Sequence, residues 1–322
     1  MIRAKAVHIR GAGGPEVLAI DDTQVREPGA SELLIEVAAA GLNRADTLQR
    51  RGFYPAPPGV AADIPGLEYA GTVAAVGSAV RAFTVGDRVM GITAGAAMAT
   101  HVVVHEREAI EVPDSLELRS AAAIPEAFLT AFDAVMIQAG LTMGERLLIH
   151  AVGSGVGTAA IQLAHGAGAV VHGTSRTAKK LERAAALGLD RGILVTDGTF
   201  ADRTQPDVIL DLIGGAYLEE NLKAINSKGR IITIGLMGGA SGKLSLGRLL
   251  AKRATLIGTV LRSRPLEEKA TLVAAFRKSV MPGFISGQFK PIVDRVLPMS
   301  AIADAHTVLE SNETYGKIVM VW

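Results

Sequence analysis

One segment near the middle of the chain constrains the fold more than any other. A short apolar stretch, residues 146–151, predicts a strand that runs directly into a turn made of Gly153, Ser154, Gly155, Val156 and Gly157, and a helix-forming segment follows. Glycines permit the sharp turn and let backbone N–H groups approach a pyrophosphate, and the helix N-terminus adds positive potential. The spacing is GxGxG rather than GxGxxG, so only the strand–turn–helix context makes the motif strong. The alternative is a glycine loop that merely packs tightly.

Strands and helices alternate after this turn, which predicts a parallel, doubly wound sheet. The first third of the chain is instead β-rich, and the three prolines of residues 54–59 predict a stiff surface loop. We therefore predict two domains, an α/β nucleotide-binding domain at residues 125–264 and a β-rich domain at residues 1–124 that is completed by residues 265–322. The expected strands of the nucleotide-binding domain include 168–173, 207–211 and 230–235, and its expected helices include 157–166 and 179–187.

The second strand of the parallel sheet indicates which dinucleotide binds. A site for NAD usually places Asp or Glu about 20 residues after the glycine turn, where it bonds the ribose hydroxyls. Residues 173–180 contain no acid, whereas Arg176 and Lys179, with Ser175 beside them, are suited to a 2′-phosphate. The sequence therefore predicts NADPH as the cofactor. The alternative is a solvated basic start to the next helix.

Composition excludes several other classes of protein. The chain has no cysteine, so it has no disulfide, thiolate metal site or cysteine nucleophile. Its 33 basic and 32 acidic residues are balanced, which disfavours a nucleic-acid partner. The most apolar stretches are interrupted by Gly, Arg or Asp before the roughly 18 residues that a membrane span needs, and the N-terminus does not read as a signal peptide. We expect a cytoplasmic protein with no membrane partner.

The chain resembles the medium-chain dehydrogenase/reductase superfamily. Zinc members carry a metal-binding Cys at the position of Asn43 and a ligand His at the position of Leu67, and the structural zinc loop with four cysteines is absent. Neither Asn nor Leu can rebuild a site that requires thiolate or imidazole ligands. The resemblance therefore implies a zinc-free member with no metal site. It also implies a GroES-like catalytic domain beside a Rossmann domain.

More specifically, the chain is similar to the quinone oxidoreductase (zeta-crystallin) branch. Within that branch it looks most like the tumour-suppressor-inducible quinone oxidoreductase group, through the segments at residues 235–239 and 261–264. The resemblance implies NADPH-dependent reduction of quinones. Further matching segments lie at residues 42–46, 52–55, 65–68, 86–89, 149–163, 209–215 and 316–319.

A quinone needs no Lewis acid, because hydride addition gives an aromatic hydroquinone. The protein must orient the ring and supply a route for protons. Asn43, Asp46 and Tyr54 are the candidate catalytic residues, Asn43 as a donor to a quinone oxygen and Tyr54 as a stacking or proton-donating group. Each has a plainer alternative: Asn43 could hold a loop, Asp46 could cap a helix, and Tyr54 could cover the proline loop. The resemblance adds Gly235, Leu261, Ser263 and Lys317 to the cofactor contacts.

Two other functions stay open at this stage. One is an NADPH-dependent reductase of α,β-unsaturated ketones or enoyl thioesters on the same scaffold, and the other is a non-catalytic NADPH-binding protein. A homodimer is expected, because the apolar strand at residues 254–260 would leave a sheet edge that invites pairing. The physiological acceptor, and the choice between one-electron and hydride reduction, cannot be derived from the sequence.

Overall fold

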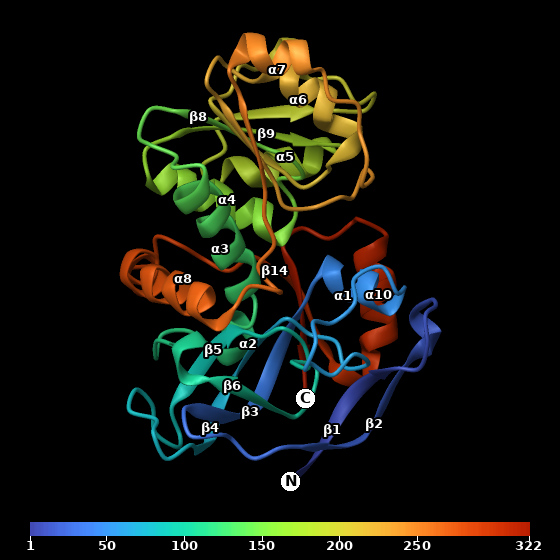
Figure 1. Cartoon of the computed structure of the whole chain (residues 1–322), viewed down its shortest axis with the longest axis vertical. Helices are drawn as coiled ribbons and strands as arrows, with labels where there is room; N and C mark the ends of the chain where they lie inside the picture. Colours follow the sequence, from blue (N-terminus) through green and yellow to red (C-terminus); the bar gives the residue numbers. More distant parts are fainter. The chain divides into compact units, whose positions relative to one another are not determined.

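The computed structural model describes all 322 residues and divides them into two compact units. The first unit contains residues 1–129 and 261–322, and the second contains residues 130–260. The predicted division at 124/125 and 264/265 lies a few residues from these boundaries. Both ends of the chain therefore build the first unit, as the blue, orange and red segments of Figure 1 show.

The second unit is built on a six-stranded parallel sheet. Its strands lie in the order β10-β9-β8-β11-β12-β13, which, counted along the chain, is the 3-2-1-4-5-6 order of dinucleotide-binding folds. The order reverses between β8 and β11, so the crevice outside the carboxyl ends of these two strands is where such folds bind ligands. The strands are β8 (Arg146–Ile149), β9 (Val170–Ser175), β10 (Arg191–Leu194), β11 (Val208–Asp211), β12 (Arg230–Thr233) and β13 (Thr255–Gly258).

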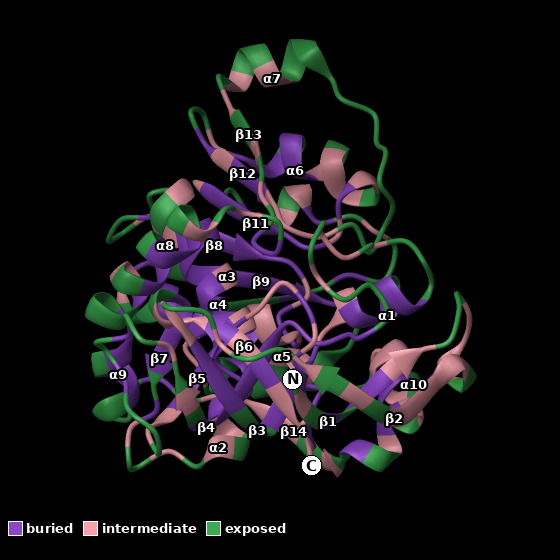
Figure 2. Cartoon of the chain, turned by 60° about the horizontal axis from the view of Figure 1, so that its bottom comes forward, coloured by how far each residue is buried: buried purple, intermediate pink, exposed green.

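Short apolar runs such as Leu147–Ile149 form central strands because helices cover the sheet and bury side chains on both faces. Figure 2 shows β8 and β9 as largely buried, whereas α7 is exposed and contains no buried residue. A hydrophobic core around Leu148, Phe200 and Ile231 lies against the sheet. The helices are a π-helical segment (Phe132–Gln138), α4 (Gly155–Gly166), α5 (Ala178–Ala185), α6 (Leu218–Ala224) and α7 (Leu246–Lys252), with short 3-10 turns at Ala201–Arg203 and Gly215–Tyr217.

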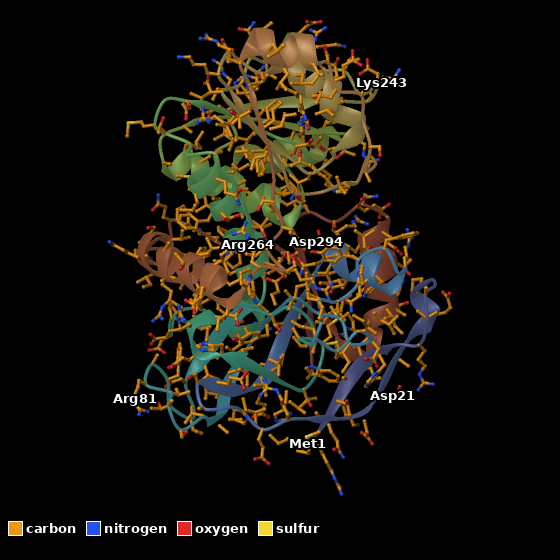
Figure 3. The ribbon with its side chains drawn as sticks, in the orientation of Figure 1. Met1, Asp21, Arg81, Lys243, Arg264 and Asp294 are labelled. Carbon is orange, nitrogen blue, oxygen red and sulfur yellow. The ribbon has the colours of Figure 1, made fainter.

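The first unit is built on a seven-stranded mixed sheet. The long strand β3 (Glu32–Leu42) organises it, because β6, β4 and β15 all pair with β3 along its length. A separate antiparallel pair is formed by β1 (Ile2–Ile9) and β2 (Leu18–Val25). Asp21 of β2, which is labelled in Figure 3, forms an ion pair with Arg10 just after β1. The remaining strands are β4 (Glu68–Val76), β5 (Arg88–Ile92), β6 (His101–His105), β7 (Ala109–Glu111), β14 (Val293–Pro298) and β15 (Lys317–Val321).

Helices of the first unit pack around this sheet. One hydrophobic cluster joins Leu42 and Met320 of the sheet to Ile302 and Ala305 of α10, so strand β3 ends against the C-terminal helix. The helices are α1 (Arg44–Arg50), α2 (Leu118–Ala121), α3 (Pro125–Ala131), α8 (Leu266–Ser279), α9 (Met281–Ile285) and α10 (Ile302–Glu310), with 3-10 turns at Pro15–Val17, Glu106–Glu108 and Met299–Ala301.

One helical stretch, Leu118–Gln138, is long and apolar enough by length and composition to cross a membrane. Of its most apolar window, 72% is buried inside the protein. Buried core helices pass the same test, so this stretch is weak evidence for a membrane span.

Candidate active site

The glycine turn lies at the carboxyl end of β8, where the strand order reverses. Ser154 is the N-cap of α4, and its hydroxyl oxygen accepts a hydrogen bond of 3.0 Å from the Gly157 amide. A Cβ atom on Gly157 would lie only 2.5 Å from the carbonyl oxygen of Ala151, so this position requires glycine. Gly155 and Val156 are the first two residues of α4, and their N–H groups have no partner from a preceding turn, so they are suited to binding an anion.

Three further predicted cofactor residues lie at the same edge of the parallel sheet. Ser175 and Arg176 stand at the end of β9, and Gly235 follows β12. The Ser175 hydroxyl oxygen accepts from the Thr177 amide at 3.1 Å, which shapes the turn into α5. Arg176 and Lys179 are exposed and form no ion pair within the protein. The residues present therefore fit a pyrophosphate at the glycine turn and a phosphate beyond β9.

His150, which lies between β8 and the glycine turn, is a structural residue. It is fully buried, and its ring nitrogens lie 2.9 Å from Thr174 Oγ1 and 2.7 Å from Asn221 Oδ1. The rings of Phe200 and Tyr217 pack edge-on at 4.9 Å each. Burial lowers the pKa of His150, so the ring stays neutral and holds the strand end in place.

A polar cluster lies in the first unit, near the ends of β3, β4 and β15. Its members are Asn43, Asp46, Gln49, Tyr54, Glu68, Glu126, Arg262 and Lys317. Lys317 Nζ lies 2.6 Å from Glu68 Oε1, 2.5 Å from Asn43 Oδ1 and 2.9 Å from the Leu42 carbonyl oxygen. Asn43 Nδ2 donates to Glu68 Oε1 at 2.9 Å and to the Gly41 carbonyl oxygen at 3.2 Å. The Asn43 amide therefore spends both N–H groups inside the protein and has none left for an acceptor in this arrangement.

The close approach of Glu68 depends on a glycine in the neighbouring strand. A Cβ atom on Gly41 would lie 2.2 Å from Glu68 Oε1 and 2.6 Å from the Ala122 carbonyl oxygen. Lys317 is placed from the other side by β15. The Tyr315 amide before it donates to Oδ1 of Asp294, which is labelled in Figure 3, at 3.0 Å. The sequence thus builds this cluster from strand ends, which are more rigid than loops.

Asp46 holds the start of α1. Its Oδ2 accepts from the Asn43 amide at 2.8 Å and its Oδ1 from the Gly66 amide at 3.0 Å, so both carboxylate oxygens are bound to backbone. Burial raises the pKa of Asp46 to about 6, and the two amide hydrogen bonds oppose that rise. This geometry matches the helix-capping alternative that the sequence left open.

Tyr54 lies in the proline loop and is held there by a buried arginine. Arg262 stacks 5.0 Å from the centre of the Tyr54 ring, and its Nη1 donates to the Tyr54 carbonyl oxygen at 3.1 Å. Arg262 also donates to Gln49 Oε1 at 2.7 Å and to the Ala94 carbonyl oxygen at 2.6 Å. Burial raises the pKa of the Tyr54 hydroxyl, and the Glu126 carboxyl acts in the same direction.

The remaining sequence-predicted residues of the first unit take no part in these contacts. Leu261 is buried and Ser263 is exposed, on either side of Arg262. Their contact with a cofactor stays a prediction, as does that of Lys317. Leu67, at the position of the zinc-ligand histidine, is a buried core residue. The structure contains no group of three or more His, Cys, Asp and Glu side chains that could hold a metal ion.

Two family models match the chain, one in its N-terminal part and one in its central and C-terminal part. The alcohol dehydrogenase GroES-like domain matches residues 29–114, and the zinc-binding dehydrogenase model matches residues 155–277. A quinone oxidoreductase from Pseudomonas aeruginosa is 31% identical over 99% of this chain and 99% of its own length. The chain belongs to the medium-chain dehydrogenase/reductase family. As a family member it has the two predicted folds, a GroES-like domain and a Rossmann domain, which confirms the predicted fold class.

Solved structures of other family members have the same fold. A quinone oxidoreductase from Pseudomonas syringae superposes with a TM-score of 0.89 at 29% identity, covering 99% of this chain and 100% of its own. A mycobacterial protein solved with NADPH has a TM-score of 0.89 at 27% identity, with the same coverage. The CurK enoyl reductase has a TM-score of 0.88 at 27% identity, covering 99% of both chains. The chain is thus a nicotinamide-dependent oxidoreductase of this family.

Sequence reasoning missed four residues of the cluster. Glu68 and Arg262 lie inside segments that carried the family resemblance, but no role was assigned to them. Gln49 gave no signal of its own. Glu126 did give a signal, because it is the only charged residue in the apolar stretch 120–131. A lone acid in such a stretch needs an explanation, since burying a carboxylate is costly.

Proposed function

We propose that this chain is an NADPH-dependent reductase of quinones that transfers hydride without a metal ion. The observation that carries the proposal is the environment of Asn43, the residue at the position of the zinc-binding cysteine. Asn43 contacts Lys317 and Glu68 at 2.5 and 2.9 Å, so its side-chain amide is engaged in an internal polar network, which supports a mechanism without a metal ion. The quinone oxidoreductases among its relatives support the choice of acceptor.

The choice of NADPH rests on the residues that follow β9. Arg176 and Lys179 are exposed and unpaired there, and residues 173–180 contain no acid for a ribose 2′-hydroxyl. Arginine binds phosphate through a planar set of donors and is well suited to a 2′-phosphate. The family member solved with NADPH supports the same choice.

Bound NADPH would supply the hydride, and the chain would orient the acceptor and manage the proton. Tyr54 offers a ring for stacking and a hydroxyl group, and Arg262 fixes its position. Asp46 and Asn43 act as positioning residues in this proposal, because their polar atoms are engaged within the protein. Of the three candidate catalytic residues predicted from the sequence, we therefore retain only Tyr54 as one that contacts the acceptor.

The second candidate is a reductase of activated alkenes. It is favoured by the likeness to the CurK enoyl reductase, whose fold and coverage match as well as those of the quinone oxidoreductases. The same hydride donor and the same cluster would serve either acceptor.

Side-by-side turnover separates the two candidates. Initial rates of NADPH oxidation are measured with a benzoquinone, a naphthoquinone, an alkenone and an enoyl thioester at equal concentrations. We expect both quinones to be reduced with a kcat/KM at least about tenfold above the alkenes, a difference of roughly 1.4 kcal/mol in transition-state binding. Faster reduction of the alkenone or thioester would replace quinones as the proposed acceptor.

We propose further that the protein is a cytoplasmic homodimer. Strand β13 is the edge of the parallel sheet, and Leu256 within it is 38% exposed. Unpaired edges of this kind pair with a second chain unless they are protected. The chain has no cysteine and so cannot form the disulfides that are typical of proteins in oxidising compartments, which supports the cytoplasmic location. Light scattering at micromolar concentration should give twice the chain mass, and a monomer would count against the dimer.

A further inference from the structure

Glu126 is the only acid of the polar cluster whose carboxyl group has no partner. Its backbone amide donates to Glu68 Oε2 at 2.8 Å, which ties the start of α3 to β4. Its side chain forms no hydrogen bond or ion pair, whereas Glu68 and Asp46 are each bound at both oxygens. Glu126 as a whole residue is half-buried, unlike Glu68 and Asp46, which are fully buried.

The surroundings of this carboxyl keep it protonated at neutral pH. Withdrawal from water is the larger cause and repulsion by Glu68 the next, and together they raise the pKa of Glu126 to about 8. Cationic neighbours oppose the rise without cancelling it. The charged and titratable groups that face Glu126 are Glu68 from β4, Lys317 from β15, Asp46 from α1, Arg262 from the segment after β13, and Tyr54 from the proline loop.

We propose that Glu126 is the catalytic acid that protonates the reduced acceptor. The inference rests on the proposed function, since it names the proton source for that same reaction. The other acid and the ammonium group near it are engaged within the protein. The Lys317 ammonium spends its donors on Glu68, Asn43 and the Leu42 carbonyl, and Asp46 accepts backbone hydrogen bonds at both oxygens.

A bound nicotinamide cofactor supplies hydride, which is two electrons and one proton, and the quinone becomes a hydroquinone monoanion. The O–H bond of Glu126 breaks, a new O–H bond forms at the phenolate oxygen, and Glu126 is left as a carboxylate that takes a proton from water. A phenol has a pKa of about 10, so a carboxyl with a pKa of about 8 gives up its proton downhill. Per turnover, one NADPH, one quinone and one proton give NADP⁺ and hydroquinone.

The Glu126→Gln variant removes the transferable proton while keeping the shape of the side chain. Wild-type kcat is expected to fall with rising pH through an apparent pKa of about 8, because the acid form is required. The variant is expected to lose about 100-fold in kcat and to lose this basic limb, with NADPH binding unchanged. Glu126→Asp keeps an acid and should recover part of kcat and a basic limb. Glu111→Gln, an exposed acid on β7, is the matched control and should behave as wild type.

Two measurements without turnover address the same ionisation. The Glu126 carboxyl resonance in ¹³C-glutamate-labelled protein, identified by its loss in Glu126→Gln, should titrate well above the usual range near 4.5. The folded state holds this proton to a higher pH than the unfolded chain does, so wild-type stability should decline as pH rises from about 4.5 to about 8. Glu126→Gln should lose that decline, and its Tm at pH 8 should exceed the wild-type value.

The outcomes separate this inference from the proposed function. If the wild type reduces quinones and Glu126→Gln keeps the same kcat and the same basic limb of the pH profile, the role of Glu126 is overturned while the proposed function stands. A Glu126 carboxyl that titrates in the ordinary range would also overturn it. A wild-type protein that reduces no quinone would overturn the proposed function first. If Glu126→Gln fails to fold, Glu126→Asp decides: a pH profile identical to that of wild type, with no loss of kcat, would contradict the proposal.

Discussion

The ammonium group of Lys317 lies 2.6 Å from the carboxylate of Glu68, and both side chains are withdrawn from solvent, with exposures of 6% and 0%. A buried ion pair of this kind is costly to break from one side, because the remaining charge loses its partner. We predict that Lys317→Met lowers the free energy of unfolding by about 3–5 kcal/mol. Urea denaturation measures this loss.

The control for this prediction is the double variant. Glu68→Gln combined with Lys317→Met leaves no isolated buried charge, so its loss of stability should be smaller than the sum of the two single losses by at least about 1 kcal/mol. Strict additivity would mean that the two side chains do not stabilise the fold as a pair.

Arg262 should control acceptor binding through Tyr54. Arg262→Lys keeps the charge but loses the planar group that stacks on the Tyr54 ring and bonds Gln49, Ala94 and Tyr54 at once. We expect KM for the quinone to rise about tenfold while the dissociation constant of NADPH stays the same. Steady-state kinetics and fluorescence titration measure the two quantities, and an unchanged KM would separate Arg262 from the acceptor site.

Arg176 should decide the preference for NADPH. In Arg176→Ala, the ratio of NADPH to NADH affinity should fall about 10- to 100-fold, since a hydrogen bond to a charged group contributes about 1.5–3 kcal/mol. Lys243→Ala removes another exposed cation from the same unit and should leave the ratio unchanged (Figure 3). Equal Michaelis constants for both cofactors in the wild type would contradict the choice of NADPH.

His306 should make the first unit sensitive to acid. Burial, and to a lesser extent the Arg50 guanidinium 3.2 Å away, lowers the pKa of His306 to about 3. Below pH 6.5 the unfolded chain binds a proton that the folded ring refuses, so stability falls as pH drops, by about 3 kcal/mol at pH 4. His306→Gln should flatten the pH dependence of the unfolding free energy between pH 6.5 and 4. An identical dependence in the variant would mean that other groups cause the acid loss.

Local patterns in the sequence were enough to predict the nucleotide-binding half. The turn from Gly153 to Gly157 lies directly between strand β8 and helix α4, so its structure can be predicted from these neighbouring segments of the sequence. The same holds for Ser175 and Arg176 at the end of β9. The order of the strands in the parallel sheet agrees with the rules for dinucleotide-binding folds.

The polar cluster could not be predicted in this way. Glu68, Glu126, Arg262 and Lys317 are far apart in the sequence, and the sheet of the first unit brings them together. The sequence offered Asn43, Asp46 and Tyr54 because they share one short segment. It did not show that Lys317 contacts Asn43 and that backbone amides bind Asp46, nor that Glu126 is the only acid of the cluster whose carboxyl group has no partner.

Metal-free reduction of quinones by NADPH can be measured on protein freed of bound metal. Protein dialysed against a strong chelator is mixed with NADPH and a naphthoquinone, and oxidation of the nicotinamide is followed by absorbance, with NADH and with added zinc in parallel. We predict rapid oxidation of NADPH that needs the quinone, is far slower with NADH and is unchanged by chelation or zinc. Absence of quinone-dependent oxidation, or activity that appears only with zinc, would contradict metal-free quinone reduction by this protein.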